Sequence, residues 1–93
     1  AVMIIDSQGC LTGIITDADL RRAMSREGAA VFDLKTARIM TAPCKRVTED
    51  ALAAEAMALF HQYRIDELPV VDGEDRPVGL IDVQDIVTLK IAE

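Results

Sequence analysis

Thr16 and Asp19 lie where an apolar, β-branched stretch ends and a helical pattern begins. Their spacing is that of a capping box, in which the Thr hydroxyl caps the helix and the acid reaches back to the Thr backbone N–H. The same atoms suit a second chemistry. Free N–H groups at a helix N-terminus attract phosphate, the hydroxyl can donate to a phosphate oxygen, and the carboxylate can accept from sugar hydroxyls. Spacing alone favours the capping box and leaves anion binding open.

Three further positions are candidates for ligand contacts. Arg22 follows Asp19 in an Arg21-Arg22 pair, which is usually a solvated helix face but whose guanidinium groups suit phosphate. Leu68 and Pro69 can form an apolar wall beside a base, although a core strand is their alternative role. The sequence contains no nucleophile–base set, metal-ligand cluster or Gly-rich phosphate loop, so we predict no catalytic residue, no metal site and no cofactor.

The stretch 13–19 recurs at 79–85. Corresponding residues are 66 positions apart, as in the pairs Gly13/Gly79, Ile15/Ile81 and Asp19/Asp85. A fixed period of this kind defines the folding unit, so the chain is predicted to contain two copies of one motif.

The second copy differs from the first at the capping position, where Asp82 replaces Thr16. A carboxylate is a good N-cap but repels a phosphate, by about 4 kcal/mol for unit charges ~4 Å apart at an effective dielectric constant of ~20. Asp85 remains a candidate partner for a ribose. We therefore expect two unequal clefts, with the phosphate at the Thr16 end.

Hydrophobic periodicity predicts an α+β order, β-β-α followed by β-α-β-β-α. The expected strands are 2–5, 11–15, 44–48, 68–71 and 77–81, and the expected helices are 16–26, 49–64 and 82–91. Gly28 is the predicted stop of the first helix, and 37–40 are expected to form one helical turn. The predicted buried stripes are Leu20, Ala23 and Met24 in the first helix, and Leu52, Ala53, Ala56, Met57, Phe60 and Tyr63 in the second.

Composition limits the classes of function. The net charge of −6 over 93 residues argues against DNA or RNA as a partner, because a nucleic-acid surface requires a basic face. No apolar run reaches the ~18 residues of a membrane span, so no membrane partner is expected. Cys10 and Cys44 lack zinc-ligand spacing and are read as reduced thiols, with a disulfide as the alternative, which predicts a cytoplasmic protein.

A tandem βαββα unit with Gly-apolar-apolar-Thr-x-x-Asp at its last strand–helix junction resembles the CBS domain, two of which pack into a Bateman pair. The resemblance implies a partial first repeat at 1–28, a connector at 29–42 and a second repeat at 43–93. The first repeat lacks its initial strand and helix, which we expect to lie before residue 1. In nucleotide-binding CBS pairs, the positions of Thr16 and Asp19 contact the phosphate and the ribose.

Several segments resemble, more narrowly, the C-terminal regulatory pair of bacterial arabinose-5-phosphate isomerases, which make a precursor of the acidic sugar Kdo. They are 13–23, 39–41, 50–56 and 67–72. The resemblance implies an upstream sugar isomerase domain that carries the catalytic residues, a homo-oligomer, and a nucleotide or nucleotide-sugar ligand in the cleft between the repeats, either CMP-Kdo or an adenine nucleotide. The alternative is a ligand-free oligomerisation module of the same or another enzyme or transporter.

Overall fold

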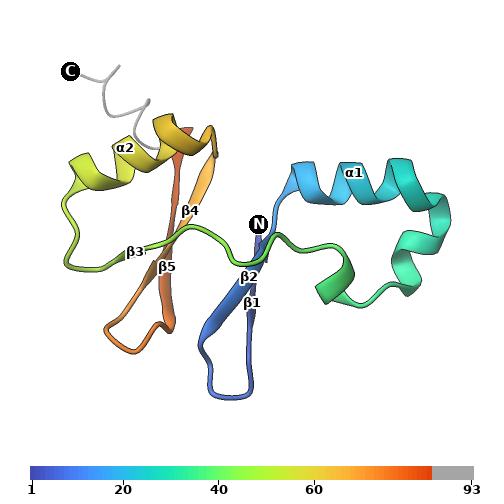
Figure 1. Ribbon diagram of the computed structural model, residues 1–93, viewed down its shortest axis with the longest axis horizontal. Coiled ribbons are helices and arrows are strands. Elements are labelled where there is room, and N and C mark those ends of the chain that lie inside the picture. The colour runs from blue at the N-terminus through green and yellow to red at the C-terminus, as the bar shows by residue number, and fades with distance from the viewer. Residues whose placement is uncertain (85–93) are drawn as a thin grey trace. The chain divides into compact units, whose positions relative to one another are not determined.

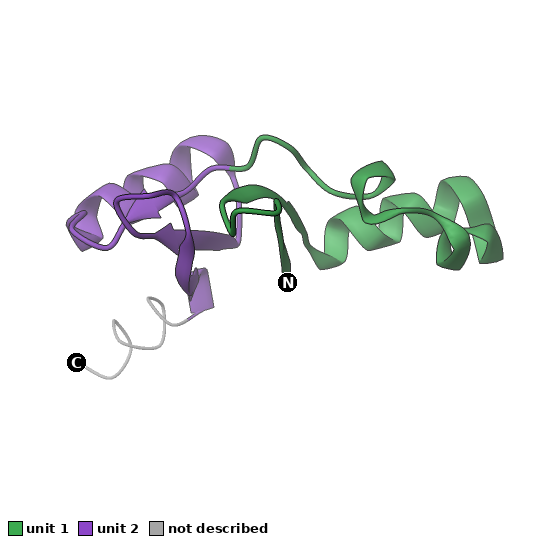
Figure 2. Cartoon of the chain, turned by 90° about the horizontal axis from the view of Figure 1, so that it is seen from below, with its two compact units in different colours: residues 1–44 green, residues 45–93 purple. Residues whose placement is uncertain are grey.

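The computed structural model describes residues 1–84 of the chain. The backbone separates into two compact units, Ala1–Cys44 and Lys45–Glu93, coloured green and purple in Figure 2. The elements in chain order are β1 (Val2–Ile5), β2 (Leu11–Ile15), α1 (Asp17–Glu27), η1 (Gly28–Asp33), η2 (Thr36–Arg38), β3 (Val47–Thr48), α2 (Ala53–Tyr63), β4 (Glu67–Val71) and β5 (Pro77–Asp82) (Figure 1). This order matches the α+β prediction throughout the described residues.

The first unit is an antiparallel hairpin, β1 with β2, followed by α1. Gly28 ends α1 with a φ of 59°, a conformation that glycine adopts without steric cost, as the sequence predicted. The chain then returns to the hairpin, where Thr41 forms an antiparallel bridge with Ile14. Two backbone hydrogen bonds of 3.1 and 2.9 Å close this bridge, so the returning segment is tied directly to β2.

The second unit is a three-stranded sheet with the order β3-β4-β5, in which β3 runs parallel to β4 and β5 antiparallel to it. Helix α2 packs on this sheet through Ala56 and Phe60, which form a core cluster with Leu68 of β4. Leu68 is fully buried, with 0% of its surface exposed. Apolar side chains on one helix stripe and one sheet face thus form the core, and Phe60 is its one aromatic member in the buried cluster.

The two hairpins repeat each other in register. Val2 pairs with Ile15 in the first hairpin, and Leu68 pairs with Ile81 in the second. The register shifts at Ile4/Ile5 in one hairpin and at Val70/Val71 in the other, again 66 residues apart. The predicted internal repeat is therefore confirmed at the level of strand pairing.

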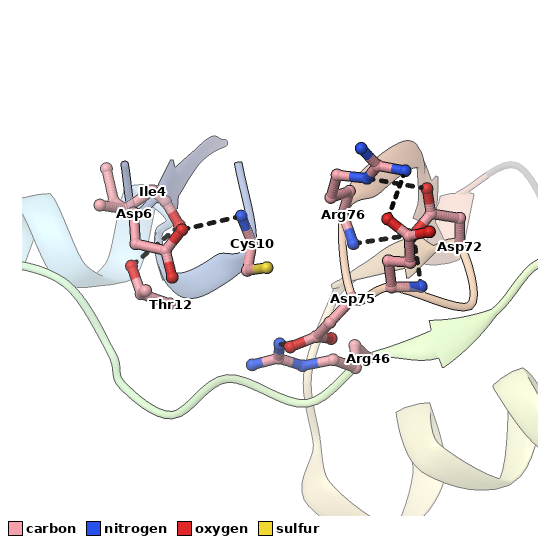
Figure 3. A network of polar contacts seen from close by, with 9 residues as sticks. Ile4, Asp6, Cys10, Thr12, Arg46, Asp72, Asp75 and Arg76 are labelled. Carbon is pink, nitrogen blue, oxygen red and sulfur yellow. Dashed lines mark hydrogen bonds and ion pairs between the residues drawn. The ribbon is translucent and has the colours of Figure 1, made fainter. Parts of the chain in front are cut away.

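The hairpin turns repeat each other in their hydrogen bonds as well (Figure 3). Asp6 Oδ1 accepts from the backbone N–H groups of Gln8 and Cys10 at 2.8 and 3.0 Å. Asp72 Oδ1 accepts from the backbone N–H groups of Glu74 and Arg76, also at 2.8 and 3.0 Å. These bonds lower the pKa of the Asp72 carboxyl, chiefly through the two backbone N–H groups, because they favour its charged form.

The two turns differ in the residue type at the position where the backbone φ is positive. Gly9 occupies it in the first turn with a φ of 84°, and Asp75 occupies it in the second with a φ of 65°. Asp75 also forms an ion pair with Arg46, whose guanidinium Nη1 lies 2.9 Å from both carboxylate oxygens (Figure 3). Aspartate tolerates this conformation better than most residues, and the ion pair ties the turn to the segment that enters β3.

Several predicted boundaries were wrong. The helix expected from residue 49 begins at Ala53, because the backbone N–H of Glu49 donates to the Val71 carbonyl at 3.0 Å and so prolongs the β3–β4 ladder. The strand expected over 44–48 is confined to Val47–Thr48. The expected helical turn over 37–40 is present as the 3₁₀ helix η2, shifted to Thr36–Arg38, and η1 was not predicted. The helix predicted over 82–91 lies, apart from its first residues, outside the described residues.

The predicted buried stripes were too wide. Only Ala23 of the α1 stripe is buried, and Leu20 and Met24 are exposed. Of the second predicted stripe, Ala56 and Phe60 are buried. The remaining positions are exposed: Leu52, Ala53, Met57 and Tyr63. Each helix is covered on only one narrow side, α1 by β2 and η1 and α2 by its sheet, so a stripe defined by apolar periodicity alone overestimates burial.

Gly13 is required for the close approach of the returning segment to β2. A Cβ atom added at Gly13 would lie 2.7 Å from Met40 Sδ and 2.9 Å from the Thr41 carbonyl oxygen. A Cβ atom at Gly79, its repeat partner, would have Val70 Cβ as its nearest neighbour at 3.8 Å, an ordinary contact. The same glycine of the motif is therefore sterically essential in one copy and not in the other.

Gly13→Ala is expected to destabilise the chain by about 1–3 kcal/mol, the usual cost of overpacking, because the Thr41 backbone cannot move aside freely. Gly79→Ala is the matched control and should change the free energy of unfolding by less than about 1 kcal/mol. Urea denaturation followed by circular dichroism measures both. Equal losses in the two variants would contradict the close contact described here.

Candidate functional site

The Thr16 end of α1 is a complete capping box. The Asp19 backbone N–H donates to Thr16 Oγ1 at 3.3 Å, and the Thr16 backbone N–H donates to Asp19 Oδ2 at 2.8 Å. The Thr16 hydroxyl also donates its proton to Asp19 Oδ2 at 2.9 Å. The capping role predicted from the spacing is thus confirmed, and a phosphate at this hydroxyl would have to draw the proton away from Asp19.

The second oxygen of the Asp19 carboxylate is also fully engaged. Oδ1 accepts from the Thr41 hydroxyl at 2.7 Å and from Arg22 Nη2 at 2.6 Å. With the two bonds to Oδ2, the carboxylate accepts four hydrogen bonds, which fills its lone-pair sites. Asp19 is only 4% exposed, so the group is a buried charge held by donors from the N-cap residue, from α1 and from the returning segment.

Two opposing effects act on the pKa of Asp19. Burial alone raises it, because a charged carboxylate is disfavoured away from water. The hydrogen bonds from the Thr41 hydroxyl and from the backbone and hydroxyl of Thr16, followed by the charge of Arg22, more than offset burial. The pKa of Asp19 is therefore below its ordinary value of 3.8, and the side chain is charged at neutral pH.

The remaining predicted ligand residues have diverse surroundings. Arg22 is brought together with Thr16 and Asp19, and its side chain is 66% exposed. Leu68 and Pro69 are both fully buried, which fits the alternative of a core strand rather than an apolar wall beside a base. Asp85 lies outside the described residues. Asp82 accepts from the backbone N–H of Gln84 at 2.8 Å, as an N-cap does.

Thr41 belongs to this site although the sequence reasoning did not select it. Its hydroxyl meets Asp19 across 22 residues of chain. Local spacing cannot reveal such a contact, because it depends on the return of the chain from η2 to β2. The sequence signals for this segment were the helical turn expected over 37–40 and the family resemblance of 39–41, and neither identifies a partner for Thr41.

A shallow basic depression of about 430 Å³ lies on the face of α1 that follows the capping box. Arg21, Arg22, Ser25 and Arg26 line it. Arg26 Nε lies 3.3 Å from a Glu27 carboxylate oxygen, and Arg22 contacts Asp19. Three arginines thus share one helix face of a chain whose net charge is −6, and two of them are paired with carboxylates.

Comparison with known proteins agrees with this geometry. The family model for the CBS domain matches residues 36–91, more than half of the chain. The chain belongs to the CBS-domain family. The match begins at η2, so it includes the segment that contributes Thr41 to the first unit.

Two kinds of enzyme are similar in sequence. Arabinose 5-phosphate isomerase KdsD of Pseudomonas aeruginosa is 41% identical over 85 residues, which make up 91% of this chain and 26% of that protein. Inosine-5′-monophosphate dehydrogenase of Mycobacterium bovis is 38% identical over 85 residues, 90% of this chain and 15% of that protein. The chain therefore spans about a quarter or less of the length of these relatives. The predicted resemblance to arabinose-5-phosphate isomerases is confirmed.

Solved CBS structures share the fold. The CBS-domain protein ATU1752 of Agrobacterium tumefaciens has a TM-score of 0.83 and 27% identity, covering 96% of this chain and 70% of that chain. The CBS domain pair of protein MJ0100 was solved with 5′-methylthioadenosine and S-adenosyl-L-methionine. It has a TM-score of 0.82 and 30% identity, and the match covers 98% of this chain and 69% of that chain. The predicted fold class, an α+β tandem CBS pair, is confirmed.

Three other findings concern the described residues alone. Residues 1–84 contain no group of three or more His, Cys, Asp or Glu side chains placed to hold a metal ion. No helix in that same part of the chain has the length and apolar character needed to cross a membrane. Cys10 and Cys44 form no disulfide bond in this part of the chain.

Asp19→Asn should destabilise the chain at pH 7 by about 1–3 kcal/mol, because four donors lose a charged acceptor. The folded-state pKa of Asp19 is lower than the unfolded value, so its stabilisation is complete above the unfolded pKa and is lost as pH falls through the folded pKa. The stability gap between wild type and variant should therefore narrow below about pH 4. Urea denaturation at pH 7 and pH 3 measures the gap.

Asp17→Asn is the matched control for this measurement. Asp17 lies in the same helical turn but is exposed. It should leave the free energy of unfolding within about 0.5 kcal/mol of wild type at pH 7. A gap for Asp19→Asn that stays constant with pH would show that the carboxylate charge is not what stabilises the capping box.

Proposed function

We propose that this chain is the regulatory CBS pair of a sugar-phosphate isomerase and that it binds a nucleotide or nucleotide-sugar at the Thr16 end of α1. The parent enzyme would be a D-arabinose-5-phosphate isomerase of Kdo biosynthesis, with its aldose–ketose isomerisation performed by a domain upstream of the pair. The 41% identity with KdsD supports this parent. The similarity to inosine-5′-monophosphate dehydrogenases makes a dehydrogenase the competing parent.

The ligand class is supported mainly by one comparison. The MJ0100 pair, 30% identical to this chain, was solved with two adenosine compounds. The cytosolic domain of the Mg²⁺ channel MgtE, 26% identical with a TM-score of 0.71, was solved with ATP. For this chain we propose that Thr16 and the N–H groups at the start of α1 receive the ligand phosphate and that Asp19 receives the ribose, with Asp85 as the corresponding acid of the second repeat.

The identity of the base and of any attached sugar is a separate part of the proposal. In a Kdo-pathway enzyme, the activated sugar CMP-Kdo is a reasonable feedback ligand, and an adenine nucleotide is the alternative. Both present a ribose and a phosphate, so both suit Asp19 together with the α1 N-terminus.

A thermal-shift screen should separate these ligands. AMP, ADP, ATP, CMP and CMP-Kdo are each added to the 93-residue chain. A ligand present at 100 times its Kd should stabilise the folded chain by about 2.7 kcal/mol and raise its Tm accordingly. A shift with CMP-Kdo but not with the adenine nucleotides supports the isomerase parent. No shift with any of the five would contradict ligand binding.

A second candidate function is assembly without a ligand, because apolar side chains remain exposed on α1. Leu20 and Met24 lie one turn apart and are both exposed. Such an i, i+4 apolar pair on a helix surface suits helix–helix contact with another copy of the chain. The homo-oligomer predicted from the family is common to both candidate functions.

Leu20→Glu should dissociate an oligomer that uses this face of α1, because the contact would bury a charge. Light scattering after size-exclusion chromatography gives the mass, and Leu52→Glu, at another exposed apolar position, is the control. An unchanged mass for Leu20→Glu would exclude α1 as the contact.

A further inference from the structure

The Asp19 carboxylate cannot bind a ligand without losing one of its present partners. A carboxylate offers about four lone-pair sites, and all four accept hydrogen bonds within the described residues. The group is also 4% exposed, so there is no free side from which a hydroxyl can approach. A ribose hydroxyl that reaches Asp19 must therefore replace a donor.

The four donors differ in how firmly they are held. The Thr16 backbone N–H and hydroxyl belong to the capping box and are fixed by the start of α1. The Thr41 hydroxyl comes from a segment fixed by two backbone hydrogen bonds to Ile14. The Arg22 side chain, in contrast, is 66% exposed and reaches Asp19 from three residues away on a long, flexible stem.

From this contrast we infer that Arg22 is an exchangeable partner of Asp19 which determines the preference for a phosphorylated ligand. This inference rests on the proposed function. A ligand hydroxyl takes the place of Arg22 at Asp19 Oδ1, and the released guanidinium binds the phosphate of the same ligand. The ligand thus breaks the charged hydrogen bond between Arg22 and Asp19, and its phosphate becomes the new anionic partner of Arg22.

The surroundings of Arg22 favour an anion as its new partner. Arg21, Ser25 and Arg26 line the same shallow depression. Once released from Asp19, Arg22 would lie unpaired beside Arg21, so a phosphate that binds Arg22 restores an ion pair to it. A nucleoside without phosphate displaces Arg22 but gives it no substitute, and should therefore bind weakly.

The test compares each nucleotide with its own nucleoside: AMP with adenosine, and CMP with cytidine. Isothermal titration calorimetry on the 93-residue chain gives the Kd of each compound for wild type and for Arg22→Ala. Arg22→Ala should bind the nucleoside about 2- to 5-fold more tightly, because a competing surface ion pair is removed. It should lose about tenfold or more of the preference for nucleotide over nucleoside, because a charged contact to phosphate is lost.

Arg38→Ala is the charge-matched control, since Arg38 is exposed in the same unit and outside the depression. It should change neither the nucleoside affinity nor the nucleotide preference by more than about twofold. Arg22→Gln guards against misfolding of the alanine variant and should act in the same direction. The exchange predicts that Arg22→Ala changes the two affinities in opposite directions, with the nucleoside bound more tightly and the nucleotide more weakly. Lost positive charge or lost stability alone would not tighten nucleoside binding.

The outcomes separate this inference from the proposed function. Binding of nucleotides by wild type with no opposite-sign effect in Arg22→Ala would overturn the exchange and leave the proposed function standing. Equal effects of Arg22→Ala and Arg38→Ala would do the same, since they would reflect net charge alone. Absence of binding by wild type for all four compounds would overturn the exchange together with the binding of these nucleotides.

Discussion

The first unit depends on one buried negative charge. The Asp19 carboxylate joins the end of β2, the first turns of α1 and the segment that returns from η2, through donors on Thr16, Arg22 and Thr41. A buried charge is costly unless its hydrogen bonds are complete, and here they are. In a unit with a two-stranded sheet and a single α-helix, this polar group links three segments beside the buried apolar side chains of Leu11, Ile14, Ala23 and Val31.

The second unit is held together in a different way. Its core is aliphatic and aromatic, with Leu68 enclosed by Ala56 and Phe60 of α2. The corresponding strand of the first unit, β1, has no counterpart of α2 among the described residues, and its Val2 and Ile5 are exposed. Two copies of one hairpin thus differ in what covers them, although their registers are the same.

Patterns that depend on near neighbours in the chain were predicted well. The capping box, the stop at Gly28 and the 66-residue repeat all follow from short spacings or from self-similarity, and the structure contains each of them. Thr41 and the late start of α2 were missed, because each depends on a backbone contact with a distant strand. Burial of Leu20 and Met57 was overestimated since periodicity defines a stripe but not the width of the surface that covers it.

The bridge between Thr41 and Ile14 bears on how the repeats can be separated in the laboratory. The family match starts at residue 36, yet the compact unit extends to Cys44. A gene divided at the family boundary would give a first fragment deprived of the Thr41 donor and of the backbone pairing that Gly13 accommodates. A division after Cys44 keeps these partners within one polypeptide, so it is the cleavage point at which the N-terminal fragment retains its own polar interior.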